Sequence, residues 1–346
     1  MQRICNTLAI NGYNVLLTGR KLKHSIPLKK ENYRQKRISC LFNKSFLFYI
    51  EYNVRLLFFL LFAKADIICA IDLDTILPCL LASAIKNKIR VYDAHELFAE
   101  QKEIITRPFV HKVWITLERF AVPKFKNGYT VNSFIKDELH ERYGVNYEIV
   151  RNLPLQSDSS PIKNINPQPY IIYQGAVNQG RSFETLIPAM KYVDAQLVIC
   201  GNGNFYDQVK GLIAANNVSD KVILKGLIQP NELRDIAAGA TLGVTLFEAT
   251  GLNQYQSLAN RFFDYIMAGI PQVCVNYPEY KKVNDVYNIG VMIDDTSEAS
   301  IATAINLLLN DSIVYEKLRY NTLKARAELN WQAEQKHLLE FYKKLQ

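Results

Sequence analysis

The stretch EATGLNQYQSLANRFFDYIMAGIP, residues 248–271, decides how the chain is interpreted. Its first residues are polar and predict a loop. Ser257 is a good helix N-cap, Gly269 suits the left-handed position after a helix, and Pro271 cannot continue one. The stretch therefore predicts a loop followed by a helix over residues 257–268.

Two faces of this helix differ in chemistry. Every fourth position is apolar, which gives a stripe of Leu258, Phe262 and Ile266. Asn260 and Arg261 precede Asp264 by four and three residues, so the three are expected to share another face near the helix start. An amide, a fixed cation and a carboxylate beside a positive helix end can hold a diphosphate and a ribose hydroxyl. The alternative is an ordinary solvated face.

Strand and helix patterns alternate on both sides of this stretch. Strands are predicted at 14–18, 66–71, 90–92, 128–131 and 148–150, and again at 170–174, 196–200, 222–225, 242–246, 272–275 and 290–293. Such alternation is typical of α/β domains with a parallel sheet and helices on both faces. The chain has 346 residues, of which 49% are hydrophobic, enough for two such cores.

The domain boundary is expected where the composition changes. Residues 155–169 are rich in Ser, Asn and Pro and predict a linker. Residues 1–154 then form an N-terminal Rossmann-like domain and 170–330 a C-terminal one, with a cleft between the carboxyl ends of their strands where ligands bind. The last helix, 331–346, is expected to pack back on the N-terminal domain.

The amino-terminal segment is basic. Residues 1–45 hold ten Lys and Arg against one acid, Glu31, whereas the whole chain has a net charge of +8. Phe46 to Ala63 is an apolar run that contains Glu51 and Arg55, too short and too charged for a comfortable membrane span. We expect a packed helix, with peripheral contact of residues 20–63 with an anionic membrane as the alternative. No nucleic-acid-binding motif accompanies the charge.

The six cysteines are scattered, with no pair at metal-ligand or redox spacing. They are expected to be buried thiols in a reducing compartment, so the chain is expected in the cytoplasm or at the inner face of the membrane. Asp72 and Asp74 could together bind Mg²⁺ or Mn²⁺. Their place between a strand and a helix favours loop and N-cap roles instead, so we expect no metal.

Several segments in order carry a family resemblance. YQGAVNQGR (173–181), VICGNGNF (198–205), KVILKGLIQPNEL (221–233) and the NRFFDYIMAGIP helix resemble glycosyltransferase family 4, which has the GT-B fold. DLDTILP and VYDAHELFAE look like its first domain. The resemblance implies a retaining, metal-independent glycosyltransferase that needs no cofactor. It would transfer a sugar from a nucleotide-sugar donor to a glycan, polysaccharide or lipid-linked acceptor of the cell envelope. The resemblance implies that this sugar is a hexose.

The resemblance also implies roles for individual residues. Donor contacts fall on Gly175, Arg181, Gly201, Gly203, Gly226, Glu248, Asn260, Arg261 and Asp264. Arg181 and His95 are the candidate catalytic residues, and His95 would approach the reacting sugar. Two positions depart from the family: Ala176 stands where an Arg is common, and Gln256 replaces the first of two acids.

The start of the chain also departs from that family. Residues 3–11 look like its first helix, and the strand and Gly-rich loop that should precede it are not in the sequence. We expect the sheet of the first domain to contain an unfilled slot with exposed strand edges. With Ala176 and Gln256, this leaves open a catalytically impaired nucleotide-sugar-binding or scaffold protein. A sugar-nucleotide epimerase of the same fold is the third alternative.

Overall fold

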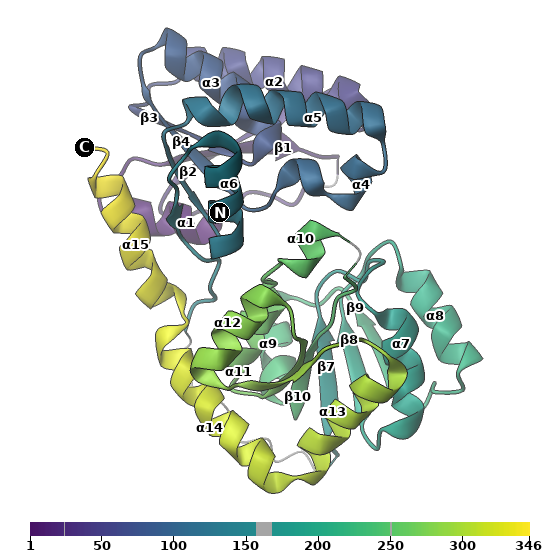
Figure 1. The fold of residues 1–346 in the computed structure, drawn as a ribbon. Coiled ribbons are helices and arrows are strands. Elements are labelled where there is room, and N and C mark those ends of the chain that lie inside the picture. Colours follow the sequence, from purple (N-terminus) through teal and green to yellow (C-terminus); the bar gives the residue numbers. More distant parts are fainter. Residues whose placement is uncertain (24, 157–167, 250) are drawn as a thin grey trace. The chain divides into compact units, whose positions relative to one another are not determined.

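The computed structural model describes residues 1–23, 25–156, 168–249 and 251–346 of the chain (Figure 1). Contacts divide it into two compact units. The N-terminal unit contains Met1–Arg151 and Glu334–Gln346, and the C-terminal unit contains Asn152–Ala333. Most of the expected linker, residues 157–167, lies outside the described residues.

The C-terminal unit is built on one six-stranded sheet. All its pairs are parallel, and the strand order is β12-β11-β10-β7-β8-β9. The strands are β7 (Tyr170–Gln174), β8 (Gln196–Cys200), β9 (Val222–Gly226), β10 (Leu242–Thr245), β11 (Gln272–Val275) and β12 (Gly290–Ile293). The order reverses between β7 and β10, as in doubly wound sheets.

Side chains of this sheet alternate between two cores, because successive strand residues point to opposite faces. Ile171 and Ile199 join the larger cluster under α7, α8 and α13, whereas Ile172 and Val198 join a smaller one that includes Ala237 of α9. The helices are α7 (Phe183–Ala189), α8 (Tyr206–Ala215), α9 (Pro230–Ala238), α10 (Leu252–Tyr255), α11 (Asn260–Ala268), α12 (Pro278–Tyr287), α13 (Glu298–Asn310) and α14 (Ser312–Glu328), with a 3₁₀ turn at Met190–Tyr192. The expected doubly wound α/β architecture is confirmed.

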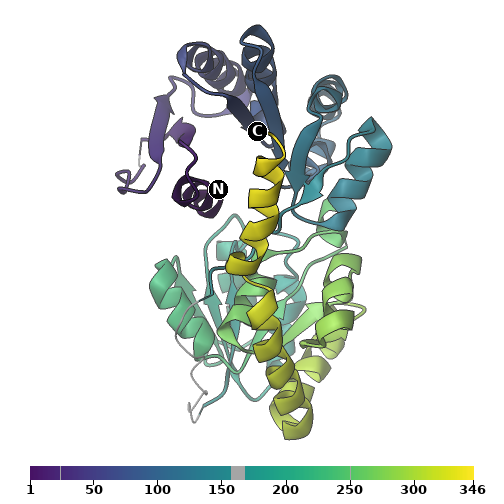
Figure 2. The ribbon, with the colours of Figure 1, turned by 90° about the vertical axis from the view of Figure 1, so that its left-hand side faces the viewer.

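The N-terminal unit has its parallel strands in two separate sheets. β1 (Leu16–Lys21) pairs with β2 (Arg34–Ser39), and β3 (Ile67–Ile71), β4 (Ile89–Ala94), β5 (Asn127–Thr130) and β6 (Glu148–Ile149) pair in that order. Figure 2 shows the β1–β2 pair set apart from the other strands of this unit. The larger sheet has its own core, which includes Ile68, Tyr92 and Phe125.

Helices flank both sheets of the N-terminal unit. They are α1 (Gln2–Ile10), α2 (Ser45–Phe62), α3 (Ile76–Ile85), α4 (Lys102–Ile105), α5 (Pro108–Ala121) and α6 (Ser133–Tyr143), with 3₁₀ turns at Leu73–Thr75, Phe98–Glu100 and Val122–Lys124. The final helix, α15 (Trp331–Lys343), belongs to this unit from Glu334 onward. Its Phe341 ring lies 5.2 Å from that of Tyr129, and Lys344 pairs with Glu148.

Some local predictions were wrong. The α11 helix begins at Asn260 rather than after Ser257, whose hydroxyl instead donates to the Gln254 carbonyl and lies 3.2 Å from the Tyr280 hydroxyl. Strand β2 was missed because its sequence, RQKRIS, is mostly charged or polar. The short α10 and the polar α12 were also missed, since neither carries a strong apolar stripe.

Candidate functional site

The candidate site of the C-terminal unit lies where β7 and β10 diverge. These strands pair only at Leu242↔Ile171 and Gly243↔Ile172. Beyond this point the Tyr265 hydroxyl of α11 lies between them, accepts from the Gln174 amide at 3.1 Å and donates to the Ile172 carbonyl at 3.1 Å. Gly243 makes room for this ring, because a Cβ there would lie 2.4 Å from it. In doubly wound sheets, the carboxyl ends of the strands at such a reversal form the ligand crevice.

Three glycine turns lie side by side at this edge. The Gly175 amide donates to the Cys200 carbonyl at 3.0 Å, and the Gly201 amide donates to the Gly226 carbonyl at 2.8 Å. A Cβ on Gly201 would stand 1.8 Å from the Gly175 oxygen, and one on Gly203 would stand 2.3 Å from the Val177 oxygen. Only glycine permits these close approaches, so backbone rather than side chains forms this part of the edge.

Two arginines converge on one aromatic ring. The guanidinium of Arg181 lies 4.3 Å from the centre of the Phe247 ring, and that of Arg261 lies 4.8 Å from it. Arg261 also lies 4.4 Å from the centre of the Tyr173 ring. Phe247 follows β10 and Tyr173 belongs to β7, so the two cations gather at the point where the strand order reverses.

Arg261 is the more deeply buried of the two. It is 7% exposed, and its Nη1 atom is buried with no hydrogen-bond partner among the described residues. The side chain is charged, because the guanidinium of an arginine is not deprotonated in proteins. A buried cation without a carboxylate partner is costly in the free protein. It is therefore poised for an anionic ligand.

Asp264 is placed by the end of β7. Its Oδ2 accepts a hydrogen bond of 2.8 Å from Nε2 of Gln174, while Oε1 of that glutamine is buried without a partner in the described structure. Asp264 is half-buried and keeps part of its carboxylate toward solvent. This hydrogen bond holds the carboxylate of Asp264 at the end of β7.

The other candidates of this unit differ in placement. The Glu248 amide donates to the Gly180 carbonyl at 3.2 Å, which ties the segment after β10 to the loop that carries Arg181. Asn260 is exposed, and its side-chain oxygen accepts from Asn152 at 3.1 Å, where the chain enters the unit. Gln256 ends the short helix α10, and Ala176 is exposed in the Gly175 turn. The residues that lie together at this edge of the sheet are Gly175, Arg181, Gly201, Gly203, Gly226, Glu248, Arg261 and Asp264.

His95 belongs to the N-terminal unit, just after β4. Its Nε2 lies 3.1 Å from Oδ1 of Asp93, and its backbone amide donates to Oδ1 of Asp72 at 2.9 Å. Burial lowers the pKa of His95, but the hydrogen bond and the charge of Asp93 outweigh it and the pKa is raised. Burial also raises the pKa of Asp72 to about 7. His95 and the carboxyls of Asp93 and Asp72 thus lie together at the carboxyl ends of β3 and β4.

Asp72 takes the N-cap position expected of it, whereas Asp74 lies inside the 3₁₀ turn Leu73–Thr75. Asp72 precedes the Leu73–Thr75 turn but makes no side-chain cap, because its carboxylate accepts from His95 instead. Burial raises the pKa of Asp74 to about 6. Within the described ranges, no three His, Cys, Asp or Glu side chains gather as metal ligands do.

Four site residues were missed by sequence reasoning: Tyr173, Gln174, Phe247 and Tyr265. The first two end β7, and Phe247 follows β10, so each occupies a carboxyl strand end. That position is a usable signal, because loops at this edge form the ligand crevice in doubly wound sheets. Tyr265 comes four residues after Arg261 on α11, one helical turn away, and the sequence analysis gave it no role.

Comparisons with known proteins concern the family and the fold. The family described as glycosyl transferases group 1 matches residues 156–325. Sucrose-phosphate synthase from Thermosynechococcus elongatus is similar in structure, with a TM-score of 0.80 and 16% identity over 99% of this chain and 92% of its own. No curated protein sequence matches the chain.

Two further solved structures are similar over nearly all of both chains. A glycosyltransferase from Rickettsia africae has a TM-score of 0.74 and 14% identity, and covers 99% of this chain and 93% of its own. Anabaena HepE in complex with UDP and glucose has a TM-score of 0.73 and 12% identity, and covers 99% and 95%. The family model matches residues within the C-terminal unit, whereas the similar structures cover the fold of both units. Residues 156–325 therefore resemble the group 1 glycosyltransferases, and the chain has the GT-B fold of two Rossmann-like domains.

Proposed function

We propose that this protein transfers a sugar from a nucleotide-sugar donor to a glycan, polysaccharide or lipid-linked acceptor, with retention and without a metal ion. The donor diphosphate binds at the edge where β7 and β10 diverge. The observation that carries this proposal is Arg261, a buried cation whose Nη1 has no hydrogen-bond partner in the described part of the chain. A diphosphate supplies the negative charge that such a group lacks.

The surrounding residues suit a nucleoside diphosphate leaving group. Arg181 and Arg261 share the Phe247 ring and so stand close enough to meet neighbouring phosphoryl oxygens. The backbone of the Gly175 and Gly201 turns can approach the same group, since no side chain intervenes. Fixed donors aimed at the charge that develops on a leaving group are usually the largest catalytic contribution. Asp264, held by Gln174, accepts from a ribose hydroxyl.

His95 is the proposed catalytic residue of the N-terminal unit. Asp93 and Asp72 hold its ring and its backbone, so the imidazole is fixed at the carboxyl end of β4. A fixed imidazole with a raised pKa can donate a hydrogen bond to a sugar hydroxyl or oxyanion near neutral pH. His95→Ala should then lower kcat more than donor binding.

Solved relatives support the donor class. HepE is described in complex with UDP-glucose, and a pneumococcal O-GlcNAc transferase in complex with UDP and GlcNAc. Both proteins share the fold of this chain at low identity, 11% and 13%. We infer the same class of donor here, a sugar activated by a nucleoside diphosphate.

The test is a panel of UDP, GDP and ADP and their sugars, followed by thermal shift and by product analysis. A nucleotide that binds the native state raises Tm by mass action. Arg181→Ala is expected to abolish donor turnover, whereas Arg234→Ala, on the exposed face of α9, is expected to retain it. If a nucleotide binds but no donor is hydrolysed or transferred, the result favours a catalytically impaired nucleotide-sugar-binding protein. If no nucleotide binds, the proposal is wrong.

We also propose that the N-terminal unit acts at the inner face of a membrane. Along α2, Phe46, Ile50, Val54, Phe58 and Phe62 recur every four residues and are 47–85% exposed, so they form one outward apolar stripe. Lys44 precedes this helix, and Arg20 stacks on its Phe48 at 3.8 Å. An outward apolar face with basic neighbours is typical of shallow binding to anionic lipid. Among the described helices we find no candidate membrane span.

Co-sedimentation with phosphatidylglycerol-containing vesicles tests this contact. Phe58→Ser together with Phe62→Ser should reduce binding at least about fivefold, because each side chain loses its burial in lipid. The matched control is Ile313→Ser, which removes an exposed apolar side chain from α14 of the other unit. Equal binding by both variants would contradict the proposal.

A further inference from the structure

Arg20 lies near the carboxyl end of β1, against an aromatic ring of α2. Its guanidinium is 3.8 Å from the centre of the Phe48 ring, and its Nη2 donates to the Asn43 backbone carbonyl at 2.7 Å and to the Asn43 side-chain oxygen at 3.2 Å. Its Nε is buried without a hydrogen-bond partner among the residues that the structure describes. Phe48 and Asn43 are neutral, so they hold the guanidinium in place but do not neutralise it. We call Arg20, Phe48 and Asn43 together the Arg20 corner.

The Arg20 corner has an excess of positive charge. Glu51 on α2 accepts from two backbone amides of the turn that follows β2 and pairs with Arg55 at 2.7 Å, so its carboxylate is already engaged. Residues 20–44 hold nine Lys and Arg against one acid, Glu31. Within the described ranges Arg20 itself forms no ion pair. A fixed cation with many basic neighbours and no acidic partner attracts anions.

Hydrogen bonds place the start of α2 at the sheet edge that carries His95. Asn53 of α2 donates to the Asp74 carbonyl at 3.0 Å, and Asp74 belongs to the turn that follows β3. Asp72, at the start of that turn, accepts from the His95 amide at 2.9 Å. Phe48 precedes Asn53 on the same helix, nearer its amino end. The Arg20 corner therefore lies on the carboxyl side of this sheet, as His95 does.

Tyr49 of α2 connects the Arg20 corner with a second arginine. Its ring lies 5.3 Å from that of Trp114 on α5, and Arg107 stands at the amino end of that helix. Burial and the charge of Asp74 raise the pKa of Tyr49, whereas the charges of Arg107 and Arg20 lower it. Both arginines thus act on one hydroxyl, and an anion at this edge would meet positive charge from two elements.

Exposed apolar side chains flank the Arg20 corner. Leu41, Phe42 and Phe46 are 79%, 45% and 66% exposed, and they stand on both sides of Asn43 in the sequence. Apolar side chains next to a fixed cation suit an amphiphile, which places its charged headgroup on the cation and its chain against the apolar surface. A small soluble phosphate would leave these side chains in water. The chemistry of the corner therefore favours an anionic lipid.

We propose that Arg20 binds the phosphate of an anionic membrane lipid and that this lipid is the sugar acceptor. The proposal rests on the proposed function, because it names the acceptor class of that activity. In the transfer, the bond from the sugar C1 to the donor diphosphate breaks and a bond from C1 to a hydroxyl oxygen of the acceptor forms. The hydroxyl proton passes to the departing diphosphate. Arg20 is a positioning residue that holds the headgroup, whereas the apolar stripe of α2 contacts the bilayer itself.

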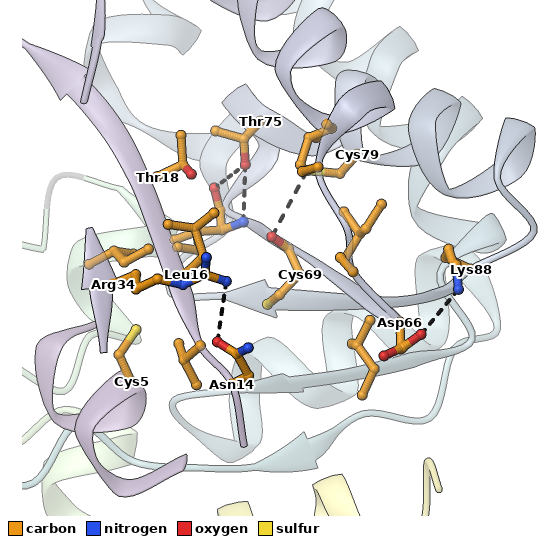
Figure 3. A pocket seen from close by; sticks show the side chains of 18 of the residues that line it. Cys5, Asn14, Leu16, Thr18, Arg34, Asp66, Cys69, Thr75, Cys79 and Lys88 are labelled. Atoms are coloured by element: carbon orange, nitrogen blue, oxygen red, sulfur yellow. Dashed lines mark hydrogen bonds and ion pairs between the residues drawn. The ribbon is translucent and has the colours of Figure 1, made fainter. Parts of the chain in front are cut away.

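Short-chain lipids below their critical micelle concentration separate headgroup recognition from adsorption to a bilayer. Dihexanoyl phosphatidylglycerol, dihexanoyl phosphatidylcholine and glycerol 1-phosphate are each titrated into the wild type, Arg20→Gln and Arg34→Gln. The matched control Arg34 is exposed at the amino end of β2, where its guanidinium donates to Asn14 (Figure 3). Tm and nucleotide titration report whether each variant is folded with an intact donor site.

The wild type and Arg34→Gln should bind phosphatidylglycerol alike, and Arg20→Gln at least about tenfold more weakly with unchanged nucleotide affinity. Phosphatidylcholine and glycerol 1-phosphate should both bind the wild type at least about tenfold more weakly than phosphatidylglycerol. Unchanged phosphatidylglycerol affinity in folded Arg20→Gln would overturn the proposal. So would equal affinity for phosphatidylcholine, since the charge would then not be recognised, or for glycerol 1-phosphate, since the ligand would then be a soluble phosphate.

Sugar transfer to phosphatidylglycerol-containing vesicles tests the acceptor role. The wild type should place labelled sugar in the lipid fraction, and Arg20→Gln should raise the KM for lipid at least about tenfold while the KM for the donor stays the same. Donor turnover without a lipid product would overturn this proposal alone. No turnover of any donor would overturn the proposed function together with it.

Discussion

The guanidinium of Arg261 lies 4.4 Å from the centre of the Tyr173 ring, so a helix and the first strand of the C-terminal unit meet through a buried cation. The Tyr173 hydroxyl does not face an acid either, since it donates to the Ala176 carbonyl at 2.7 Å. The contact stabilises the charge by its geometry on the ring but does not neutralise it. The site therefore keeps an electrostatic cost that an anion relieves.

This cost predicts an unusual response to Arg261→Met. The substitution removes the buried charge and keeps a long apolar side chain against Tyr173. We expect the free energy of unfolding without ligand to stay unchanged or to rise by about 1–2 kcal/mol. Urea denaturation of the free protein measures this. A loss of more than about 2 kcal/mol would show that Arg261 is mainly a structural residue.

Two glycines of the C-terminal unit should respond in opposite ways to substitution by alanine. Gly201→Ala would place a Cβ 1.8 Å from the Gly175 oxygen, so we expect a loss of at least about 2–3 kcal/mol in the free energy of unfolding. Gly211 lies in α8 and an added Cβ meets nothing within 4 Å, so Gly211→Ala should stabilise by about 0.5–1 kcal/mol. Thermal unfolding of both variants checks the pair. Equal effects would mean that the turns can move apart.

Strand positions in the C-terminal unit could be predicted from the sequence because apolar runs there have clear ends. β7, β8, β11 and β12 begin and end where expected. Each is a short buried strand bounded by turn residues, and this pattern can be recognised in the sequence without knowledge of the fold. In contrast, the side chains of β2 are mostly polar, so its sequence does not predict a strand. Its strand conformation depends on the pairing with β1.

Asp264 predicts recognition of the ribose. Asp264→Asn keeps an oxygen that can accept from Gln174, so stability should change by less than about 1 kcal/mol. The charge that strengthens a hydrogen bond from a ribose hydroxyl is lost, and nucleoside diphosphate affinity should fall about tenfold. Calorimetry with the ribose and 2′,3′-dideoxyribose forms tests this. The wild type should prefer the ribose form, and a preference that persists unchanged in Asp264→Asn would contradict the assignment.

Asp72 predicts a pH dependence of stability. Burial raises its pKa to about 7, so between about pH 4 and pH 7 the folded state holds a proton that the unfolded state has released. Its contribution is therefore largest at low pH and falls as the pH rises to about 7. Asp72→Asn should reduce this fall in the free energy of unfolding by about 2 kcal/mol, a value lowered because the side chain is partly exposed to solvent.

Urea titrations at pH 5, 6, 7 and 8 measure this effect. The control is Asp207→Asn on α8, whose side chain is 88% exposed and should leave the profile unchanged. A wild-type profile that rises between pH 5 and 7, or one that Asp72→Asn does not alter, would show that Asp72 is already ionised in the folded protein.

The candidate site was only partly accessible from sequence. Spacing brought Arg261 and Asp264 to one helix, but it could not show that Arg261 is buried between Tyr173 and Phe247. These two residues are 74 positions apart in the chain, and the pairing of β7 with β10 brings their rings together. Nor could spacing show that the side-chain oxygen of Asn260, next to Arg261 in the sequence, accepts from Asn152.

Nucleotide binding to Arg261→Met tests the central claim most directly. Isothermal titration of UDP, GDP and ADP into the wild type identifies the nucleotide, and the same titration is repeated with Arg261→Met and with the exposed control Arg234→Met. We predict that Arg261→Met loses at least about tenfold in affinity, while Arg234→Met binds as the wild type does. Unchanged affinity in a folded Arg261→Met protein would contradict the account of this edge as the diphosphate site.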